Sequence, residues 1–228
     1  MLNLHCLRRW PDKGFAILRH HSCHSSGGTL MTLYDIKPRF QALLRPLLRC
    51  LHARGVTANQ VTLLALVMSV IAGVAFALSP SPVFLIALPV FLFVRMALNA
   101  IDGMLAREFN QQSRLGALLN ELGDVISDAA LYLPFALLPF SSGMLVVLMV
   151  ILAILTEFSG ILVQTQIGKR NYAGPCGKSD RALIFGAWGL CIALWPSLLA
   201  YNNIVWCVVC ILLGWTVVNR CRAALAAE

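Results

Sequence analysis

The chain has 228 residues, of which 59% are hydrophobic and only 12% are charged, and its formal net charge is +8 at pH 7. A soluble domain of this length cannot bury so much apolar surface, so the composition excludes an ordinary soluble fold and indicates a protein of the lipid bilayer. The basic residues lie in short polar segments between apolar runs, without the interleaved aromatic residues of a nucleic-acid surface, which excludes a nucleic-acid-binding module.

Residues 1–30 differ in composition from the rest of the chain and hold four of its five histidines, in a segment that ends in a Ser/Gly-rich run. They lack the continuous apolar core of a signal peptide. We expect an N-terminal extension without ordered structure and assign it no function, and Met31 is an alternative point at which translation begins.

Residues 31–55 are predicted to form an amphipathic helix. Apolar residues recur with the i, i+3, i+4, i+7 spacing of one helical face, while basic and amide residues repeat every four positions on another face. The apolar face comprises Phe40, Leu43, Leu44, Leu47, Leu48 and Leu51, and the polar face comprises Lys37, Gln41, Arg45 and Arg49. Because the segment has too many arginines to span a bilayer, we expect it to lie along the cytoplasmic headgroups, with its arginines near anionic lipid phosphates.

Residues 56–228 are predicted to form an all-α, polytopic membrane domain with six transmembrane helices. The six apolar runs are Val61–Leu78, Val83–Ile101, Leu115–Phe140, Met144–Ile167, Ala182–Ala200 and Ile204–Asn219, each near the ~20 residues that a crossing requires. The turns near residues 80, 142 and 202 carry no Lys or Arg, whereas the alternate loops, 102–114 and 168–181, and the tails are basic. The positive-inside rule therefore places both termini and these two loops in the cytoplasm.

Polar residues gather where the second and third predicted spans meet at the cytoplasmic face. Asn120, Asp124 and Asp128 are spaced i, i+4, i+8 and so share one helical face, and Arg95, Asn99 and Asp102 share a face of the preceding span. Carboxylates inside an apolar run are costly and mark a functional site by default. Oxygen ligands without nearby His or Cys favour Mg²⁺ or Mn²⁺ over zinc, and Mg²⁺ in turn suggests a phosphate substrate.

The residues Asp102-Gly103-x-x-Ala106-Arg107, followed after eight residues by Gly116-x-x-x-Asn120-x-x-x-Asp124, resemble the signature of the CDP-alcohol phosphatidyltransferase family. That signature reads D-x-x-D-G-x-x-A-R, about eight residues, then G-x-x-x-D-x-x-x-D. Upstream, the run from Thr57 to Thr62, TANQVT, resembles the family's T-P-N-x-x-T, with alanine in place of proline. In architecture the resemblance extends from Thr57 to the C-terminus, and it is strongest to enterobacterial inner-membrane members.

The resemblance implies transfer of a phosphatidyl group from a CDP-linked lipid, such as CDP-diacylglycerol, to a small alcohol, with release of CMP and with Mg²⁺ or Mn²⁺ as cofactor. It implies that Asp124 is the catalytic base and a metal ligand and that Asp102 is a metal ligand. Asn99 and Asn120 stand at the other two metal-binding positions. The implied nucleotide-binding residues are Asn59, Thr62, Gly103, Ala106, Arg107 and Gly116. It further implies a cytoplasmic active site in a bacterial inner membrane, and a homodimer is compatible with it because family members are usually dimeric.

The chain departs from the signature because asparagine stands at the first and third aspartate positions, Asn99 and Asn120. An amide oxygen binds a divalent cation more weakly than a carboxylate, since it carries no full charge. Three explanations stay open: one metal ion suffices, Asp128 and Glu121 supply substitute charge, or the site is degenerate. For Asp128 the sequence favours a structural ion pair with Arg95 over a metal role.

The basic loop at 168–181 offers Lys178 and Arg181 as candidates for binding a phosphate of the acceptor. Positive-inside charge, with Asp180 capping the next helix, is the alternative explanation. Glu157 lies mid-way through the fourth span and must face the bundle or a cavity, as a structural or an acceptor-binding group.

Two other functions compete with the transferase. A catalytically degenerate homologue would bind CDP or lipid without chemistry, and Asn99 and Asn120 would mark the lost activity. An ion-coupled transporter would use Asp124, Asp128 and Glu157, but it leaves the Asp-Gly-x-x-Ala-Arg spacing unexplained and no repeat relates the two halves of the sequence.

Overall fold

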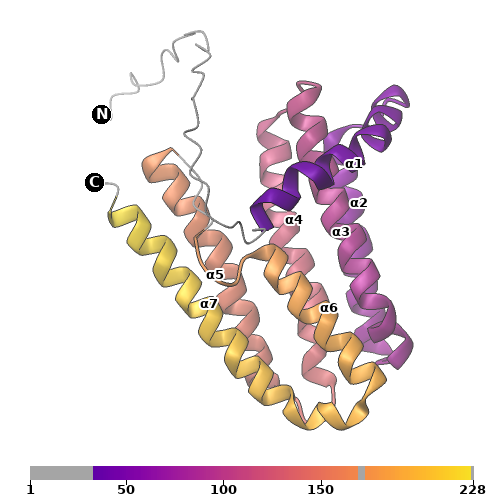
Figure 1. The fold of residues 1–228 in the computed structure, drawn as a ribbon, viewed down its shortest axis with the longest axis vertical. Coiled ribbons are helices and arrows are strands. Elements are labelled where there is room, and N and C mark those ends of the chain that lie inside the picture. Colours follow the sequence, from indigo (N-terminus) through magenta and orange to yellow (C-terminus); the bar gives the residue numbers. More distant parts are fainter. Residues whose placement is uncertain (1–32, 169–172, 227–228) are drawn as a thin grey trace, which may run out of the picture.

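The computed structural model describes residues 33–168 and 173–226, and all regular structure within these two ranges is helical (Figure 1). The α-helices are α1 (Leu33–Ala53), α2 (Ala58–Leu78), α3 (Pro82–Glu108), α4 (Arg114–Tyr132), α5 (Gly143–Ile167), α6 (Lys178–Leu194) and α7 (Asn202–Leu225). Two 3₁₀ helices, η1 (Leu133–Leu137) and η2 (Pro196–Tyr201), follow α4 and α6. The prediction of an all-α fold is confirmed, and the expectations for residues 1–30 lie outside the described residues.

The helices pack in three main pairs: α2 against α4, α3 against α6, and α5 against α7. In Figure 1, α5 and α7 run side by side on one flank of the molecule. The first pair approaches closely at Gly73, where an added Cβ would overlap the backbone oxygen of Ala130. Small residues at such crossings let membrane helices pack through their backbones.

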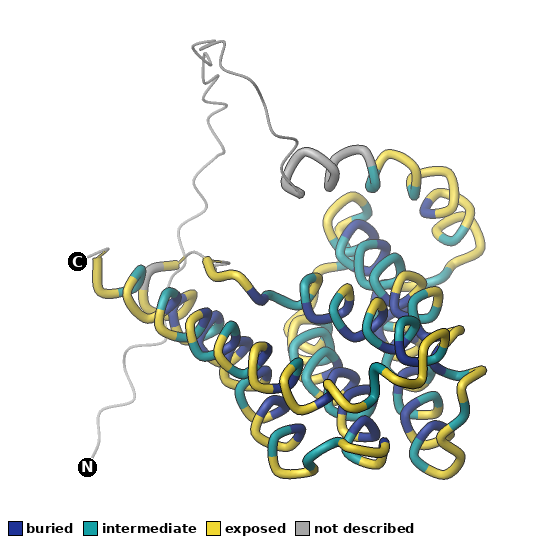
Figure 2. Tube along the Cα trace, turned by 60° about the horizontal axis from the view of Figure 1, so that its bottom comes forward, coloured by how far each residue is buried: buried dark blue, intermediate teal, exposed yellow. Residues whose placement is uncertain are grey.

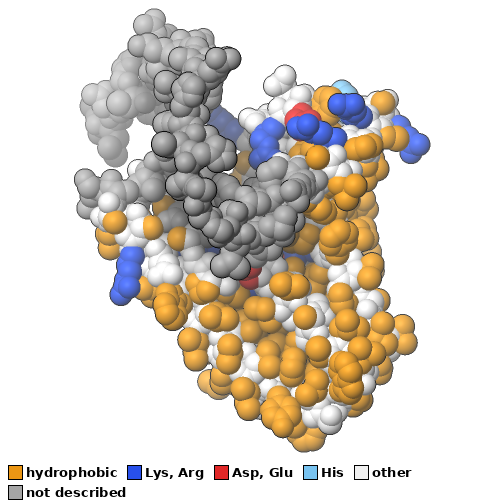
Figure 3. Space-filling view, in the orientation of Figure 1, with side chains coloured by type: hydrophobic (Ala, Val, Ile, Leu, Met, Phe, Trp, Pro, Cys, Tyr) orange, Lys and Arg blue, Asp and Glu red, His pale blue; other side chains and the backbone are white. Residues whose placement is uncertain are grey.

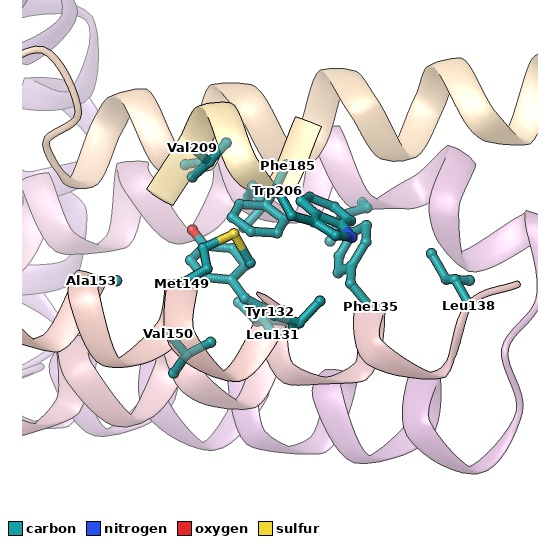
Figure 4. Close-up of a cluster of buried hydrophobic side chains, with 14 of the residues drawn as sticks. Leu131, Tyr132, Phe135, Leu138, Met149, Val150, Ala153, Phe185, Trp206 and Val209 are labelled. Atoms are coloured by element: carbon teal, nitrogen blue, oxygen red, sulfur yellow. The ribbon is translucent and has the colours of Figure 1, made fainter. Parts of the chain in front are cut away.

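Aromatic side chains from four elements form the centre of the core (Figure 4). Tyr132 of α4 stacks on Phe185 of α6 with ring centroids 3.9 Å apart, and Phe185 in turn stacks on Trp206 of α7 at 5.6 Å. Phe135 of η1 meets Phe185 and Trp206 edge-on. The cluster begins one turn after Asp128 on α4, and its ring contacts hold α4, α6 and α7 together.

The outer surface of the bundle is largely apolar. Many of the positions that are exposed in Figure 2 carry large hydrophobic side chains, and the lower part of the face in Figure 3 shows hydrophobic side chains without Lys, Arg, Asp or Glu. Leu78 and Met144 are among many large hydrophobic side chains that are mostly exposed. Among the residues that the structure describes, four helical segments are long and apolar enough to cross a membrane: Ala58–Leu78, Pro82–Glu108, Gly143–Gln166 and Pro196–Leu225. This surface is consistent with a polytopic membrane protein, because lipid rather than water favours it.

Six crossings remain a prediction, because α4 and α6 are shorter and more polar than the apolar runs suggested. The third predicted span, Leu115–Phe140, is divided between α4 and η1, and Pro134 stands at the division. The fifth, Ala182–Ala200, is divided between α6 and η2, where Pro196 begins the 3₁₀ helix. Proline lacks the N–H that would continue the α-helical hydrogen bonds.

The helices also extend further toward the basic end than the predicted spans. Helix α3 continues to Glu108, so the first half of the segment predicted as the 102–114 loop is helical, and Asp102 lies on one helix with Arg95 and Asn99 as the spacing predicted. Helix α6 begins at Lys178, where Asp180 Oδ2 accepts a hydrogen bond from the backbone N–H of Gly177 at 2.8 Å. Both extensions matter for the site, since helical geometry sets the direction of these side chains.

Helix α1 lies within the segment 31–55 that was predicted to be an amphipathic helix. It crosses the end of the bundle that carries most of the visible charge (Figures 1 and 3). Leu48 is fully buried in a small cluster with Ile101, Met104 and Leu105 of α3, and Leu44 and Leu51 pack against it. Leu43 and Leu47 of the predicted apolar face stay exposed. The location of α1 among lipid headgroups remains a prediction.

Candidate functional site

The candidate site lies where the start of α2, the end of α3, the first half of α4 and the start of α6 meet. The α2 terminus is ordered by a capping box: Thr57 accepts a hydrogen bond from the N–H of Gln60, and Gln60 accepts one from the N–H of Thr57. Gln111 of the α3–α4 loop accepts a hydrogen bond from the N–H of Ala58 at 2.7 Å. These contacts attach the start of α2 to the loop between the two motif-bearing helices.

Asp102 is buried in the last part of α3 and is bound by a residue of α2. The hydroxyl of Thr62 donates to Asp102 Oδ2 at 2.7 Å. Thr62 is also buried, and its hydroxyl oxygen lies 3.1 Å from the carbonyl of Ala58. One oxygen of the Asp102 carboxylate is therefore held by the protein, and Asp124 and Lys178 both lie within electrostatic range of Asp102.

Asp124 faces α3 and α6 from the middle of α4. Its Oδ1 atom accepts a hydrogen bond from Asn99 Nδ2 at 3.3 Å and forms an ion pair with the ammonium of Lys178. Arg95 Nη2 lies 4.0 Å from the same oxygen and donates to the backbone carbonyl of Asp124 at 3.3 Å. The Asp124 side chain is 16% exposed and that of Lys178 is 20% exposed, so both groups are partly open to solvent.

Asn59 and Gly116 form a close contact between α2 and α4. An added Cβ on Gly116 would lie 2.6 Å from Asn59 Oδ1 and 3.0 Å from Ser113 Oγ. Ser113 caps α4 by accepting the Gly116 N–H at 2.9 Å. A side chain at position 116 would therefore displace the Asn59 amide, which gives the glycine of the motif a steric reason.

Gly103 and Arg107 lie one turn apart at the end of α3. A Cβ on Gly103 would meet only the guanidinium of Arg107, at 3.5 Å. Arg107 itself is exposed, whereas Ala106 is half-buried and packs against the cluster around Leu48. A Cβ at Gly103 would make only an ordinary van der Waals contact, so the helix surface is not crowded there, and Arg107 supplies a cation beside it.

One turn further along α4 from Asp124, a buried ionic network around Asp128 connects α3, α4, α5 and α6. Arg95 Nη1 lies 2.7 Å from Asp128 Oδ1, and Arg181 Nε and Nη2 donate to Asp128 Oδ2 at 3.0 and 2.7 Å. Arg181 also donates to Glu157 Oε1 at 2.9 Å and to Thr156 Oγ1 at 3.0 Å, both on α5. Each charge has a partner of opposite sign, which is the condition for keeping it inside a bundle.

The structure thus separates the two cations that the sequence offered for an acceptor phosphate. Arg181 is 1% exposed and bound by three side chains, while Lys178 lies at the polar cluster beside Asp124. Asn120 lies one turn before Asp124 on α4 and is half-buried. Two contacts carried no sequence signal: that of Thr156, a neutral residue beside Glu157, with Arg181, and that of Gln111 with the start of α2.

The chemistry of the donor set fits one divalent cation. Asp102 and Asp124, with the amide oxygens of Asn99 and Asn120, are hard oxygen ligands of the kind that Mg²⁺ and Mn²⁺ prefer. The Lys178 ammonium on Asp124 Oδ1 indicates that this position accepts positive charge. Within residues 33–168 and 173–226, no group of three or more His, Cys, Asp or Glu side chains is arranged as a metal site, so amide oxygens and substrate phosphates would complete the coordination.

Comparison with family models and curated proteins gives three similarities. The model of the family described as CDP-alcohol phosphatidyltransferase matches residues 55–218. An inner membrane protein of Escherichia coli (strain K12), YnbA, is 59% identical over 195 residues, which cover 86% of this chain and 97% of that protein. An archaetidylinositol phosphate synthase of Pyrococcus horikoshii is 31% identical over 105 residues, 46% of this chain and 54% of that protein.

Solved structures of Mycobacterium tuberculosis phosphatidylinositol phosphate synthase (PgsA1) have a similar fold. The structure with CDP-DAG bound superposes with a TM-score of 0.64 at 21% identity, covering 78% of this chain and 92% of that chain. The structure in complex with manganese and citrate superposes with a TM-score of 0.65 at 21% identity, covering 79% and 88%. At this identity the likeness shows a common fold.

Proposed function

Because the chain belongs to the CDP-alcohol phosphatidyltransferase family, we propose that it transfers a phosphatidyl group from a CDP-linked lipid, CDP-diacylglycerol in particular, to the hydroxyl of a small alcohol. CMP is the second product. The observation that carries the proposal is the meeting of Asp102 and Asp124, from α3 and α4, with Thr62, Asn99 and Lys178 around them. Family membership supports phospholipid biosynthesis, and the donor and acceptor are the proposed part.

In the proposed reaction Asp124 is the base. Its carboxylate takes the proton of the acceptor hydroxyl, whose oxygen forms a bond to the donor phosphorus as the bond from that phosphorus to the CMP oxygen breaks. A positioned carboxylate base contributes typically ~10²–10⁴-fold to the rate. Asp124 suits this role because it is partly exposed, while the backbone carbonyl of the same residue is held by Arg95.

The cation and the nucleotide have separate groups of residues. Asp102, Asp124, Asn99 and Asn120 would hold the Mg²⁺ or Mn²⁺ ion, which when bound neutralises diphosphate charge and stabilises the departing CMP. The nucleotide-binding residues are proposed to be Asn59, Thr62, Gly103, Ala106, Arg107 and Gly116. Lys178 is the cation proposed to meet a substrate phosphate, whereas Arg181 is engaged in the buried network.

We further propose a bacterial inner-membrane location, with both termini and the active site on the cytoplasmic side. The name of the E. coli relative and the apolar helices support the membrane location, and the concentration of visible Lys and Arg at one end of the molecule supports the orientation (Figure 3). A homodimer is part of the same proposal.

The test is CMP release by purified, detergent-solubilised protein given CDP-diacylglycerol, Mg²⁺ or Mn²⁺, and a pool of small polyols and polyol phosphates. We expect metal-dependent CMP from the wild type and a loss of about 10²-fold or more in Asp124→Asn. Mass spectrometry of the lipid product then identifies the acceptor. Equal CMP release by both proteins would show that Asp124 is not the base.

A second candidate function is binding of CDP or lipid without turnover. It is favoured by Asn99 and Asn120, which leave only Asp102 and Asp124 as carboxylates at the four motif positions, and by the ion pair that Lys178 forms with Asp124. Metal-dependent binding of CDP without CMP release from any acceptor pool would favour this function over the transferase.

A further inference from the structure

The side chain of Lys178 supplies a positive charge next to a proposed metal ligand, Asp124. Lys178 is the first residue of α6, and its ammonium forms an ion pair with Asp124 Oδ1. The same oxygen accepts a hydrogen bond from Asn99, and Arg95 lies 4.0 Å away. One oxygen of the proposed base and metal ligand therefore has one hydrogen-bond donor, Asn99, and two cationic groups, Lys178 and Arg95, around it.

A divalent cation that coordinates Asp124 Oδ1 needs the space and the charge that Lys178 now uses. Because Asn99 and Asn120 carry no negative charge, they do not help the site to hold the Lys178 ammonium and a metal ion at the same time. Asp102 is within electrostatic range of Lys178 as well, so the ammonium lowers the negative potential at both remaining carboxylates. The lysine and a metal ion thus compete for one oxygen.

We propose that Lys178 is an exchangeable internal counter-ion: it pairs with Asp124 in the substrate-free protein and transfers to a phosphate of the bound nucleotide when a divalent cation takes its place. The inference rests on the proposed function, from which the metal and the diphosphate are taken. It assigns Lys178 different effects on metal binding in the two states. Without nucleotide the lysine opposes the metal, and with nucleotide it no longer does.

The neighbourhood of Lys178 permits such a movement, whereas that of Arg181 does not. A lysine ammonium sits on a flexible four-carbon stem and binds phosphate as a point charge. Lys178 follows Gly177 at the first position of α6 and is 20% exposed. Arg181, one turn later, is bound to Asp128, Thr156 and Glu157 and is 1% exposed. Arg181 can hold α6 in place while the Lys178 side chain changes partner.

The experiment measures Mn²⁺ binding by electron paramagnetic resonance on the full-length protein in detergent, without nucleotide and then with saturating CDP. Lys178→Met removes the charge and keeps the length of the side chain. Arg222→Gln is the matched control, because it removes a positive charge from an exposed position on the last turn of α7. Circular dichroism and thermal unfolding establish that each variant is folded.

Without CDP we expect Lys178→Met to bind Mn²⁺ about tenfold more tightly than the wild type, since a competing unit charge is removed. With CDP this gain disappears or reverses, because the wild-type ammonium then contributes to the phosphates. Arg222→Gln should follow the wild type in both conditions.

Equal Mn²⁺ affinity of wild type and Lys178→Met without CDP overturns the inference and leaves the proposed function intact. A gain of the same size with and without CDP also overturns it, because the lysine then never leaves Asp124. Absence of Mn²⁺ binding in folded wild-type protein, even with CDP, overturns the proposed function together with the inference.

Discussion

Thr62 of α2 donates its hydroxyl hydrogen to Asp102 Oδ2 of α3 at 2.7 Å, and both residues are buried. The bond joins the T-A-N-Q-V-T run before the first predicted span to the Asp-Gly-x-x-Ala-Arg run forty residues later. It holds one oxygen of the Asp102 carboxylate in place. The two sequence motifs therefore meet at one place in the fold.

We predict that Thr62→Val lowers metal affinity and CMP release by about 10–100-fold, because a hydrogen bond to a charged group is worth about 1.5–3 kcal/mol. Valine keeps the shape of threonine without the donor. Thr62→Ser, which keeps the hydroxyl, should retain most of the activity. Steady-state CMP release and Mn²⁺ titration provide the measurements, and a Thr62→Val protein with wild-type values would show that the bond has no functional role.

The contact between Asn59 and Gly116 leads to a second prediction. In Gly116→Ala the new methyl group would lie 2.6 Å from Asn59 Oδ1, so the amide must move. If Asn59 binds the cytidine end, the KM for the CDP-lipid should rise about tenfold with little change in kcat. A tenfold rise corresponds to the loss of roughly 1.4 kcal/mol, which is the contribution of one hydrogen bond.

Gly214→Ala on α7 is the control for that variant, because an added Cβ there has no neighbouring atom within 4 Å. It should leave KM and kcat unchanged. Identical kinetics for the two alanine variants would argue against a nucleotide-binding role for Asn59.

The buried network around Asp128 predicts a loss of stability rather than a selective loss of chemistry. Arg181→Gln leaves the Asp128 and Glu157 carboxylates without their common partner, and breaking a buried pair costs about 3–5 kcal/mol. We expect a lower midpoint of thermal unfolding in detergent, with Arg222→Gln unchanged.

A double-mutant cycle tests whether these residues act together. In Asp128→Asn/Arg181→Gln the destabilisation should be smaller than the sum of the two single losses, since both single changes break the same Asp128–Arg181 pair and the sum counts that pair twice. Strict additivity would mean that the two side chains do not interact in solution.

The burial of Cys176 leads to a prediction about how fast its thiol reacts with maleimide. Cys176 lies in the segment before α6 and is fully buried, and burial raises the pKa of its thiol to about 11. Below that pH the neutral thiol predominates, and the thiolate is the nucleophile, so maleimide should modify Cys176 very slowly at pH 8. Exposed Cys50 and Cys221 should react readily under the same conditions.

Peptide-level mass spectrometry after timed labelling measures these rates. Unfolding in denaturant should bring Cys176 to the rate of the exposed thiols. Rapid labelling of Cys176 in the folded protein would mean that this segment is open in solution.

Much of the fold was predictable because the relevant signals are local. The apolar runs predicted an all-helical chain, and the spacing of Asn120, Asp124 and Asp128 predicted that they share one face of α4. Helical periodicity operates over three or four residues, so such statements need no knowledge of the tertiary structure. The motif that resembles the family signature is also a local pattern.

The helix ends were less predictable. Hydropathy extended the third and fifth spans through Pro134 and Pro196, whereas the structure changes to 3₁₀ helix at both. A run of apolar residues indicates a membrane or core environment but does not reveal where the backbone hydrogen-bond pattern changes.

Sequence alone determined which residues carry charge inside the apolar runs and on which helical face each one lies. Only the tertiary structure decided their partners: Lys178 pairs with Asp124, while Arg181, three residues later, binds Asp128 across 53 positions of sequence. Both lysine and arginine had been equal candidates for an acceptor phosphate. The packing of α6 against α3, with α4 beside them, directs one of the two toward the site and the other into the bundle, because positions three apart on a helix differ in depth by about one turn.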